Sequence, residues 1–201
     1  MRILRIVFTF ILVLGMHSLS WSAGVGGAQE AETIFMAKKA YADGFYEVSL
    51  EILERFKNDF PHSPKAAEAR ILTAQCYFFQ GRYLEALNIL EGLLAEPGAN
   101  NFKDAVYFWI AEVHFKGNNF EKAAVFYDLV IQDFPQSSFV PAAYYSLGWS
   151  FSQIGKYSLA LKSFQSLLDK FPNEPQSKDA EAAAILARAD TDIGGDFGLR
   201  R

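Results

Sequence analysis

An interval of 37 residues separates four pairs of an aromatic residue and a small residue: Tyr46 with Ser49, Tyr83 with Ala86, Phe120 with Ala123, and Tyr157 with Ala160. The same interval links a row of small residues, Ala37, Ala74, Ala111 and Gly148, and a row of large ones, Leu53, Leu90, Tyr127 and Phe164. A shared period of this length is typical of a solenoid of stacked units.

Each unit contains two apolar stripes with a glycine between them, at Gly44, Gly81, Gly117 and Gly155. In the fourth unit the first stripe lies in residues 144–151 and the second in residues 157–168. Both stripes have the helical period and neither alternates as a strand would. The small residues allow two antiparallel helices to approach closely. Each unit is therefore predicted to be a helix, a turn and a helix, and no segment has the pattern of a strand.

Local signals agree with these helix boundaries. Ser63 precedes Pro64 and is expected to cap a helix, and Ser138 and Ser177 are expected to do the same for later helices. Proline cannot donate a main-chain hydrogen bond, so the Phe-Pro pairs are expected to end helices; these are Phe60-Pro61, Phe134-Pro135 and Phe171-Pro172. At the second junction Pro97-Gly98 takes their place.

These residues resemble the tetratricopeptide repeat (TPR) family over roughly residues 30–172. The fourth unit matches the family pattern through Tyr144, Leu147, Gly148, Phe151, Gly155, Tyr157, Ala160, Phe164, Leu167 and Pro172. The third matches through Tyr107, Ile110, Ala111, Phe120, Ala123, Tyr127, Val130 and Pro135. The resemblance implies an all-α fold, a right-handed α-solenoid of four helix-turn-helix units with a C-terminal capping helix.

The period differs from the family's usual period of about 34 residues, because three more residues stand at each junction. The segments 60–63 and 134–137 both read Phe-Pro-x-Ser. In this they are similar to bacterial cell-envelope TPR proteins of the type of the periplasmic coordinator associated with the Tol–Pal system. That coordinator carries a coiled coil before its repeats, whereas here the first repeat follows the N-terminal segment closely, so trimer formation is not expected.

The N-terminal segment has the layout of a secretory signal peptide. Arg2 and Arg5 precede an apolar run at residues 6–14, and Ser20 and Ser22 offer the small side chains that a signal peptidase requires. Cleavage after Ser22 is the first expectation, and an uncleaved inner-membrane anchor is the alternative. A lipoprotein is not expected, because no cysteine stands beside the cleavage site. Either outcome predicts repeats outside the cytoplasm, in the periplasm.

The expected domain organisation follows from the repeat. Residues 1–22 are the signal peptide, 23–29 a flexible lead, 30–190 the TPR domain and 191–201 a frayed tail. Within the domain the units span 30–62, 63–99, 100–136 and 137–173, and a helix at 177–190 caps the end of the stack.

The charge balance argues against nucleic acid as a partner. Removal of residues 1–22 takes two of the 19 Lys and Arg and none of the 23 Asp and Glu, which leaves 17 minus 23, or −6. Phosphate binding requires clustered cations, and the longest basic cluster is Lys38-Lys39.

No residue group suggests catalysis, a cofactor or a metal. Cys76 is the single cysteine, so no intrachain disulfide can form, and it is interpreted as a small, half-buried side chain. His114 is interpreted as a core residue, and Glu112 and His114, two apart on one helix, are expected to point in different directions. The chain is therefore not expected to be an enzyme.

The family resemblance implies that the first helices of the units line a concave groove that binds a protein or peptide. The groove positions, transferred one by one, are Ile34, Lys38, Tyr41, Ile71, Gln75, Phe78, Phe108, Glu112, Phe115, Tyr145, Trp149 and Ser152. The basic residues with which some TPR domains grip a carboxylate are missing here, and the aromatic content suits an apolar or amphipathic segment. The alternative is that several of these aromatics pack between units.

Two functions agree with these features. The first is a non-catalytic extracytoplasmic adaptor whose groove binds a protein or peptide of an envelope complex. The second is a structural scaffold that associates with itself through the ends of its repeats.

Overall fold

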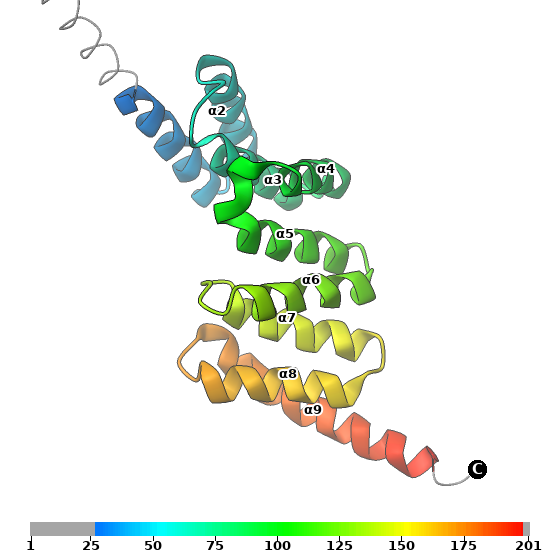
Figure 1. The fold of residues 1–201 in the computed structure, drawn as a ribbon. Coiled ribbons are helices and arrows are strands. Elements are labelled where there is room, and N and C mark those ends of the chain that lie inside the picture. Colours follow the sequence, from blue (N-terminus) through cyan, green and yellow to red (C-terminus); the bar gives the residue numbers. More distant parts are fainter. Residues whose placement is uncertain (1–26, 199–201) are drawn as a thin grey trace, which may run out of the picture. The chain divides into compact units, whose positions relative to one another are not determined.

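The structure, a computed structural model, describes residues 27–198. A helix at residues 27–42 comes first. The elements that follow are α2 (Tyr46–Asp59), α3 (Ala66–Phe79), α4 (Tyr83–Leu94), the 3-10 helix η1 (Pro97–Phe102), α5 (Lys103–Lys116), α6 (Phe120–Asp133), α7 (Val140–Gln153), α8 (Tyr157–Lys170) and α9 (Pro175–Gly198) (Figure 1). Residues 27–198 contain no strand. The expected all-α solenoid fold, four helix-turn-helix units and a terminal helix, is confirmed.

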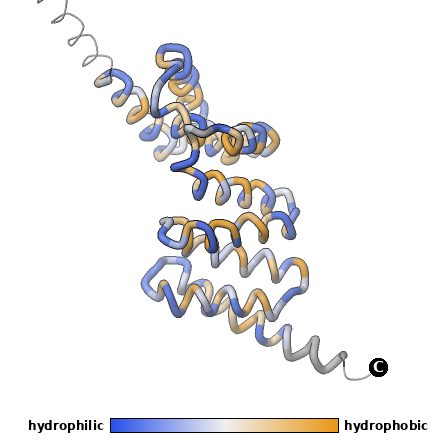
Figure 2. The backbone as a smooth tube through the Cα atoms, viewed as in Figure 1, coloured by the Kyte–Doolittle hydropathy of each residue, from blue (hydrophilic) through white to orange (hydrophobic). Residues whose placement is uncertain are grey.

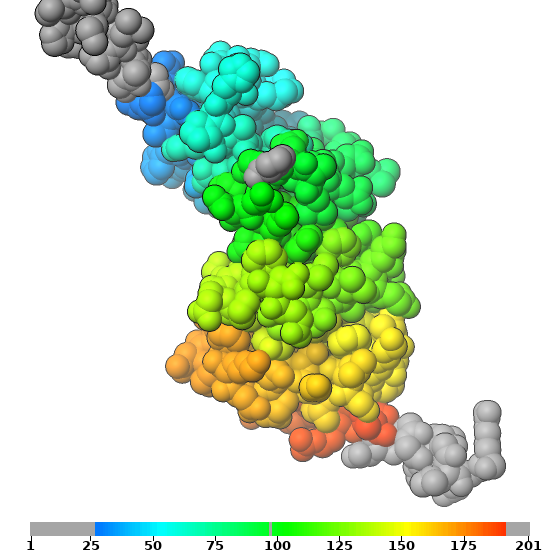
Figure 3. Space-filling view, in the orientation of Figure 1, coloured from blue at the N-terminus to red at the C-terminus, as the bar shows by residue number. Residues whose placement is uncertain are grey.

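The chain forms two compact units, Met1–Cys76 and Tyr77–Arg201. In the second unit each helix from α4 to α9 packs against the next, and α7 also contacts α9. These helices follow one another in sequence order (Figure 1), and their side chains close the space between neighbouring layers (Figure 3). The α5–α6 and α8–α9 turns are hydrophilic (Figure 2). None of the helices in residues 27–198 is long and apolar enough to cross a membrane.

The two ends of the repeat region differ from the expected limits. Residues 27–29, expected in the flexible lead, already belong to the first helix. The terminal helix was expected at 177–190 with a frayed tail after it, but α9 extends from Pro175 to Gly198. The expected signal peptide lies outside the residues that the structure describes.

In the first unit, residues of the first helix, α2 and α3 form one core. It contains Ile34, Ala37, Leu53, Phe56, Ala69, Leu72 and Cys76. Ser49 stands at the position where the three later helical repeats have alanine. Its buried hydroxyl donates to the main-chain oxygen of Ala37 at 2.9 Å. This bond satisfies a polar atom that would otherwise be buried without a partner. Cys76 is fully buried, more deeply than the half-buried position expected from the sequence, and burial raises the pKa of its thiol.

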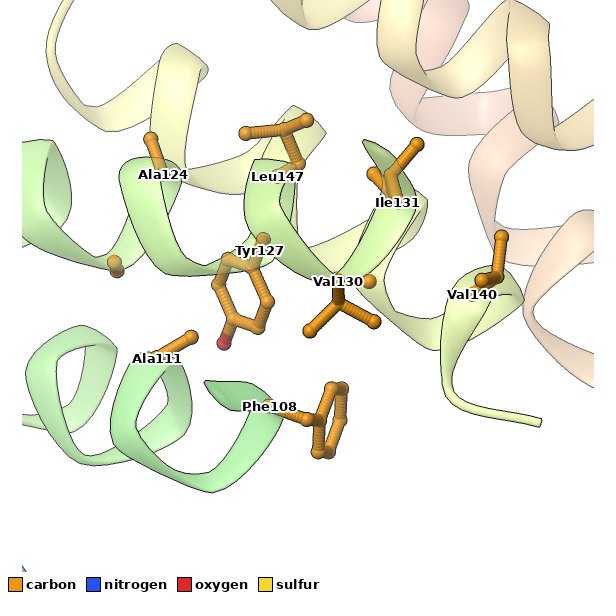
Figure 4. Packing of buried hydrophobic residues seen from close by; sticks show 10 residues of the cluster. Phe108, Ala111, Ala124, Tyr127, Val130, Ile131, Val140 and Leu147 are labelled. Carbon is orange, nitrogen blue, oxygen red and sulfur yellow. The ribbon is translucent and has the colours of Figure 1, made fainter. Parts of the chain in front are cut away.

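One core cluster of the second unit lies among α5, α6 and α7. Its buried side chains include Phe108, Tyr127, Val130, Val140 and Leu147 (Figure 4). A second cluster, between α8 and α9, contains Phe164, Leu167 and four alanines of α9. Gly148 of α7 faces this second cluster, because a Cβ atom placed there would lie 2.5 Å from the Phe164 ring.

A serine links consecutive repeats at two junctions that are 74 residues, or two periods, apart. Ser137 donates to Asp104 at 2.6 Å and accepts from the main-chain N–H of Phe139 at 3.2 Å. Ser63 likewise donates to Glu30 and accepts from the N–H of Lys65. The expectation of a Ser138 cap was wrong by one residue, because the hydroxyl of Ser137 accepts this bond. Ser177 does not cap either, since its hydroxyl donates to the main-chain oxygen of Phe171 at 2.6 Å.

The turn between the two helices of each repeat requires one residue in the left-handed region. Gly44, Gly81 and Gly155 have φ of 80°, 75° and 72°. In the third repeat this residue is Asn118, with φ 57°, while Gly117, which lies between the two helices as expected, has φ −82°. Asn118 keeps the interval of 37 residues, and asparagine is one of the few residues other than glycine that tolerate this conformation.

Asn118→Gly is therefore expected to stabilise the protein by about 0.5–1 kcal/mol, because glycine adopts positive φ without a steric cost. Gly155→Ala is expected to destabilise it by about 1–2 kcal/mol at the equivalent position. Urea unfolding measures both changes. Gly117→Ala is the control and is expected to stay within about 0.5 kcal/mol, because its φ is ordinary. If Asn118→Gly unfolds at the same or a lower urea concentration than the unchanged protein, the assignment of strain to Asn118 is wrong.

Candidate functional site

The candidate site in the second unit is the face that α5 and α7, the first helices of two consecutive repeats, present together. Glu112 of α5 accepts a hydrogen bond from Ser146 of α7 at 3.3 Å, so the two helices meet at this face. On the same two helices Phe115, Tyr145, Trp149 and Ser152 are half-buried. An aromatic surface with one acidic group is thus available on two adjacent helices.

The aromatic side chains of this face pack against other rings. Trp149 lies edge-on to Phe164, with ring centroids 5.8 Å apart, and Tyr145 contacts both Trp149 and Phe164. Phe115 packs edge-on against Phe120 at 5.3 Å. Rings held in this way lose little further conformational freedom when a ligand covers them, which favours binding.

Glu112 is tied to the core beneath the face. Its Oε1 accepts a hydrogen bond of 2.6 Å from the hydroxyl of Tyr127, which is completely buried on α6. Burial raises the pKa of Glu112, although the hydrogen bonds from Tyr127 and Ser146 and the charge of Lys116 oppose this shift. Burial and the adjacent Glu112 carboxylate both raise the pKa of Tyr127, so its hydroxyl remains a donor. The hydrogen bonds from Tyr127 and Ser146 therefore hold the carboxyl group of Glu112 at a fixed place.

The structure separates the other predicted groove residues by burial. Four of them are buried side chains that take part in packing: Ile34, Ile71, Phe78 and Phe108. Phe108, for example, stacks on Phe139 at 4.8 Å and contacts Tyr127 edge-on. For these four positions the structure supports the alternative that the side chains stabilise the fold, because neighbouring side chains cover them.

In the first unit the predicted positions present a more polar surface. Lys38 is exposed and forms an ion pair with Glu68. Gln75 and Tyr41 are half-buried, and Tyr41 contacts Tyr46 with ring centroids 5.8 Å apart. Burial, followed by interaction with Cys76, raises the pKa of Tyr41 to about 12, so this side chain is neutral at physiological pH.

Sequence reasoning missed the partner of Glu112. Tyr127 belongs to a row whose other members are Leu53, Leu90 and Phe164, so it is the single member with a polar atom to satisfy. A buried tyrosine hydroxyl needs a partner, which is the signal that could have indicated Glu112. Glu112 and His114 have different partners, because Glu112 bonds to Tyr127 and Ser146, whereas His114 stacks on Phe126 at 5.9 Å.

Comparison with known proteins shows the family and the fold. Family models described as tetratricopeptide repeat match residues 36–102, 105–137 and 142–174. A search of curated proteins found no match.

Solved structures with the same fold include a tetratricopeptide repeat protein from Parabacteroides merdae, which is 18% identical with a TM-score of 0.62. The match covers 81% of this chain and 61% of that one. A thermophilic TPR protein from Thermus thermophilus is 19% identical with a TM-score of 0.63, over 81% of this chain and 84% of that one. YrrB, whose structure is described as a TPR protein with an unusual peptide-binding site, is 18% identical with a TM-score of 0.60. That match covers 80% of this chain and 76% of YrrB. At these identities the likeness establishes the fold.

Proposed function

Because this chain belongs to the tetratricopeptide repeat family, whose members mediate protein–protein interactions and are typically non-catalytic scaffolds, we propose that it is an adaptor. Its binding site is the face of α5 and α7, and its partner is a protein segment with apolar side chains. The observation that carries this proposal is the half-buried aromatic set Phe115, Tyr145 and Trp149 on the two helices that the hydrogen-bonded carboxyl group of Glu112 joins. Aromatic side chains often provide most of the energy of such interfaces. The comparison with YrrB supports a peptide ligand by analogy.

The proposal includes a location outside the cytoplasm, in the cell envelope, with a partner in an envelope complex. It rests on the signal-peptide layout of residues 1–22 and on the Phe-Pro-x-Ser junctions. An alkaline phosphatase fusion after residue 190 tests the location, since this enzyme is active only after export. An inactive fusion that is present in normal amount would contradict export.

Site-specific crosslinking tests the binding face. A photoreactive benzophenone side chain at Ser152 is expected to form a crosslink to a partner protein in intact cells. The Ser152 hydroxyl donates to the main-chain oxygen of Gly148, so the hydrogen bond that this replacement removes lies within α7. Trp149→Ala and Phe115→Ala are each expected to weaken the crosslink about tenfold or more, the effect of a lost aromatic anchor.

The matched control is the same photoreactive side chain at Leu84, an exposed apolar position on α4. Circular dichroism checks that Trp149→Ala and Phe115→Ala remain folded, because both rings also contact neighbours. Identical crosslinked products from Ser152 and Leu84 would show that the face of α5 and α7 has no specific partner.

Self-association is the second candidate, and one feature of α9 favours it. Ile185 and Leu186 are 65% and 61% exposed on the last helix. Ile185 lies 37 residues after Gly148, at the position where each preceding repeat has a small residue. Light scattering separates the candidates, because a scaffold grows with protein concentration and an adaptor keeps one size. Ile185→Gln should reverse such growth.

A further inference from the structure

A groove lies between α6 and α8, apart from the face of α5 and α7. It has a volume of about 620 Å³, within the range of ligand and peptide pockets. Tyr144, Leu147 and Phe151 of α7 line it, and Val125 of α6 and Leu159 of α8 stand on its two sides. At about 100° per residue the three α7 side chains lie on a different face of that helix from Tyr145 and Trp149. This groove, the α6–α8 groove, is therefore separate from the proposed adaptor site.

The two sides of the α6–α8 groove expose apolar side chains to solvent. Val125 is 58% exposed and Leu159 is 42% exposed. Together with the aromatic side chains of α7 they form an apolar lining that runs from one wall to the other. Such a lining gains free energy when a ligand removes it from water.

The two walls carry opposite charges. On one side the lining includes Lys156, directly before α8, and Lys162 and Lys170 of α8. On the other side it includes Glu121 and Asp128 of α6. Lys170 donates to the hydroxyl of Tyr144 at 2.9 Å, which holds one cation over the lining. Lys156 and Lys162 form no ion pair with any residue that the structure describes. Two unpaired cations beside an apolar lining attract a carboxylate, and the acidic wall repels a second one.

We propose that the α6–α8 groove is a docking site for a short amphipathic peptide segment of a partner protein. The segment places bulky apolar side chains over Tyr144, Leu147 and Phe151, with Asp or Glu beside them toward α8 and a cation or neutral residue toward α6. An anionic lipid surface fits less well, because the carboxylates of Glu121 and Asp128 would face its head groups. The partner is thus recognised by charge of opposite sign along its two edges.

A random dodecapeptide library displayed on phage is the probe. It is panned on the protein and then counter-selected on the double variant Leu159→Gln/Lys162→Glu. Both positions are exposed, so the variant is expected to fold normally. Peptides retained by the unchanged protein and lost by the variant are expected to share bulky apolar residues next to Asp or Glu. Each is expected to bind the variant at least about tenfold more weakly, as fits the loss of one apolar and one ionic contact.

The matched control is Leu84→Gln on α4, which is expected to leave the affinity of these peptides unchanged. Ser152→Glu, on the face of α5 and α7, is also expected to leave it unchanged, so a failure of the adaptor site and a failure of this groove are distinguishable. The proposal is overturned if counter-selection removes every peptide or leaves only peptides without an acidic residue. It is equally overturned if Leu84→Gln weakens binding as much as the double variant.

Discussion

Gly148→Ala is expected to lower the free energy of unfolding by about 1–3 kcal/mol, although alanine has a higher helix propensity than glycine. A Cβ atom at position 148 would lie 2.5 Å from Cε1 and 2.7 Å from Cδ1 of Phe164. The Phe164 ring cannot withdraw, because it is completely buried between α7, α8 and the alanines of α9. The overlap therefore forces the helices apart, at a cost greater than the gain of about 1 kcal/mol in propensity.

Thermal unfolding measures this effect, and a second variant shows its cause. Phe164→Leu on the Gly148→Ala background creates the pair that the first repeat has, where Ala37 and Leu53 belong to one core. The double variant is expected to recover a substantial part of the lost stability, with a coupling of about 0.5–3 kcal/mol between the two sites. Phe164→Leu alone is expected to destabilise, because it leaves a cavity. An unchanged melting temperature for Gly148→Ala would show that α7 and α8 can separate freely.

Tyr127→Phe is expected to cost about 1.5–3 kcal/mol at neutral pH, the usual worth of a hydrogen bond to a charged group. It removes the donor that lies 2.6 Å from Oε1 of Glu112 and leaves the carboxylate with the longer bond from Ser146. Urea unfolding measures the change. Tyr107→Phe is the control, because Tyr107 packs against the same core through its ring. Equal losses for the two variants would contradict a specific role of the Tyr127 hydroxyl.

The pH dependence of the free energy of unfolding tests whether Glu112 is the hydrogen-bond partner of Tyr127. Burial raises the pKa of Glu112 in the folded protein, so the folded state binds its proton more readily than the unfolded chain does. The protonated carboxyl group of Glu112 therefore contributes to the free energy of unfolding. This contribution is fully present below the ordinary pKa of glutamate, and it is lost as pH rises through the raised pKa that Glu112 has in the folded protein. Glu112→Gln is expected to abolish this dependence. On the Glu112→Gln background Tyr127→Phe should cost only about 0.5–1.5 kcal/mol, as for a neutral hydrogen bond.

The repeat of 37 residues was sufficient to predict helix-turn-helix units, because spacing along the chain fixes which face of a helix is apolar. Gly117 lies between α5 and α6 as expected, but the left-handed residue of this turn is Asn118, which keeps the interval of 37 residues and has φ 57°. The expectation at Ser138 was wrong because two neighbouring serines compete for one cap and the geometry of the turn selects Ser137.

The residues of the candidate site were harder to predict from the sequence than the fold was. Phe108 and Phe115 both belong to the predicted groove, yet Phe108 is buried against Phe139 and Phe115 is half-buried. Their residue type is the same, and what differs is the set of neighbours that other helices bring to them. The α6–α8 groove has the same origin, because its apolar and charged residues come from three helices.

The sequence by itself determined the helical hairpins, their number and the interval between them, because these depend on the periodic placement of apolar, small and turn-forming residues. Only the tertiary structure decided which side chains are exposed and which polar groups meet. The bond from Tyr127 to Glu112 joins residues 15 apart, and the bond from Ser146 to Glu112 joins residues 34 apart. Such contacts depend on how closely neighbouring helices approach, which is set by the volumes of all the side chains between them.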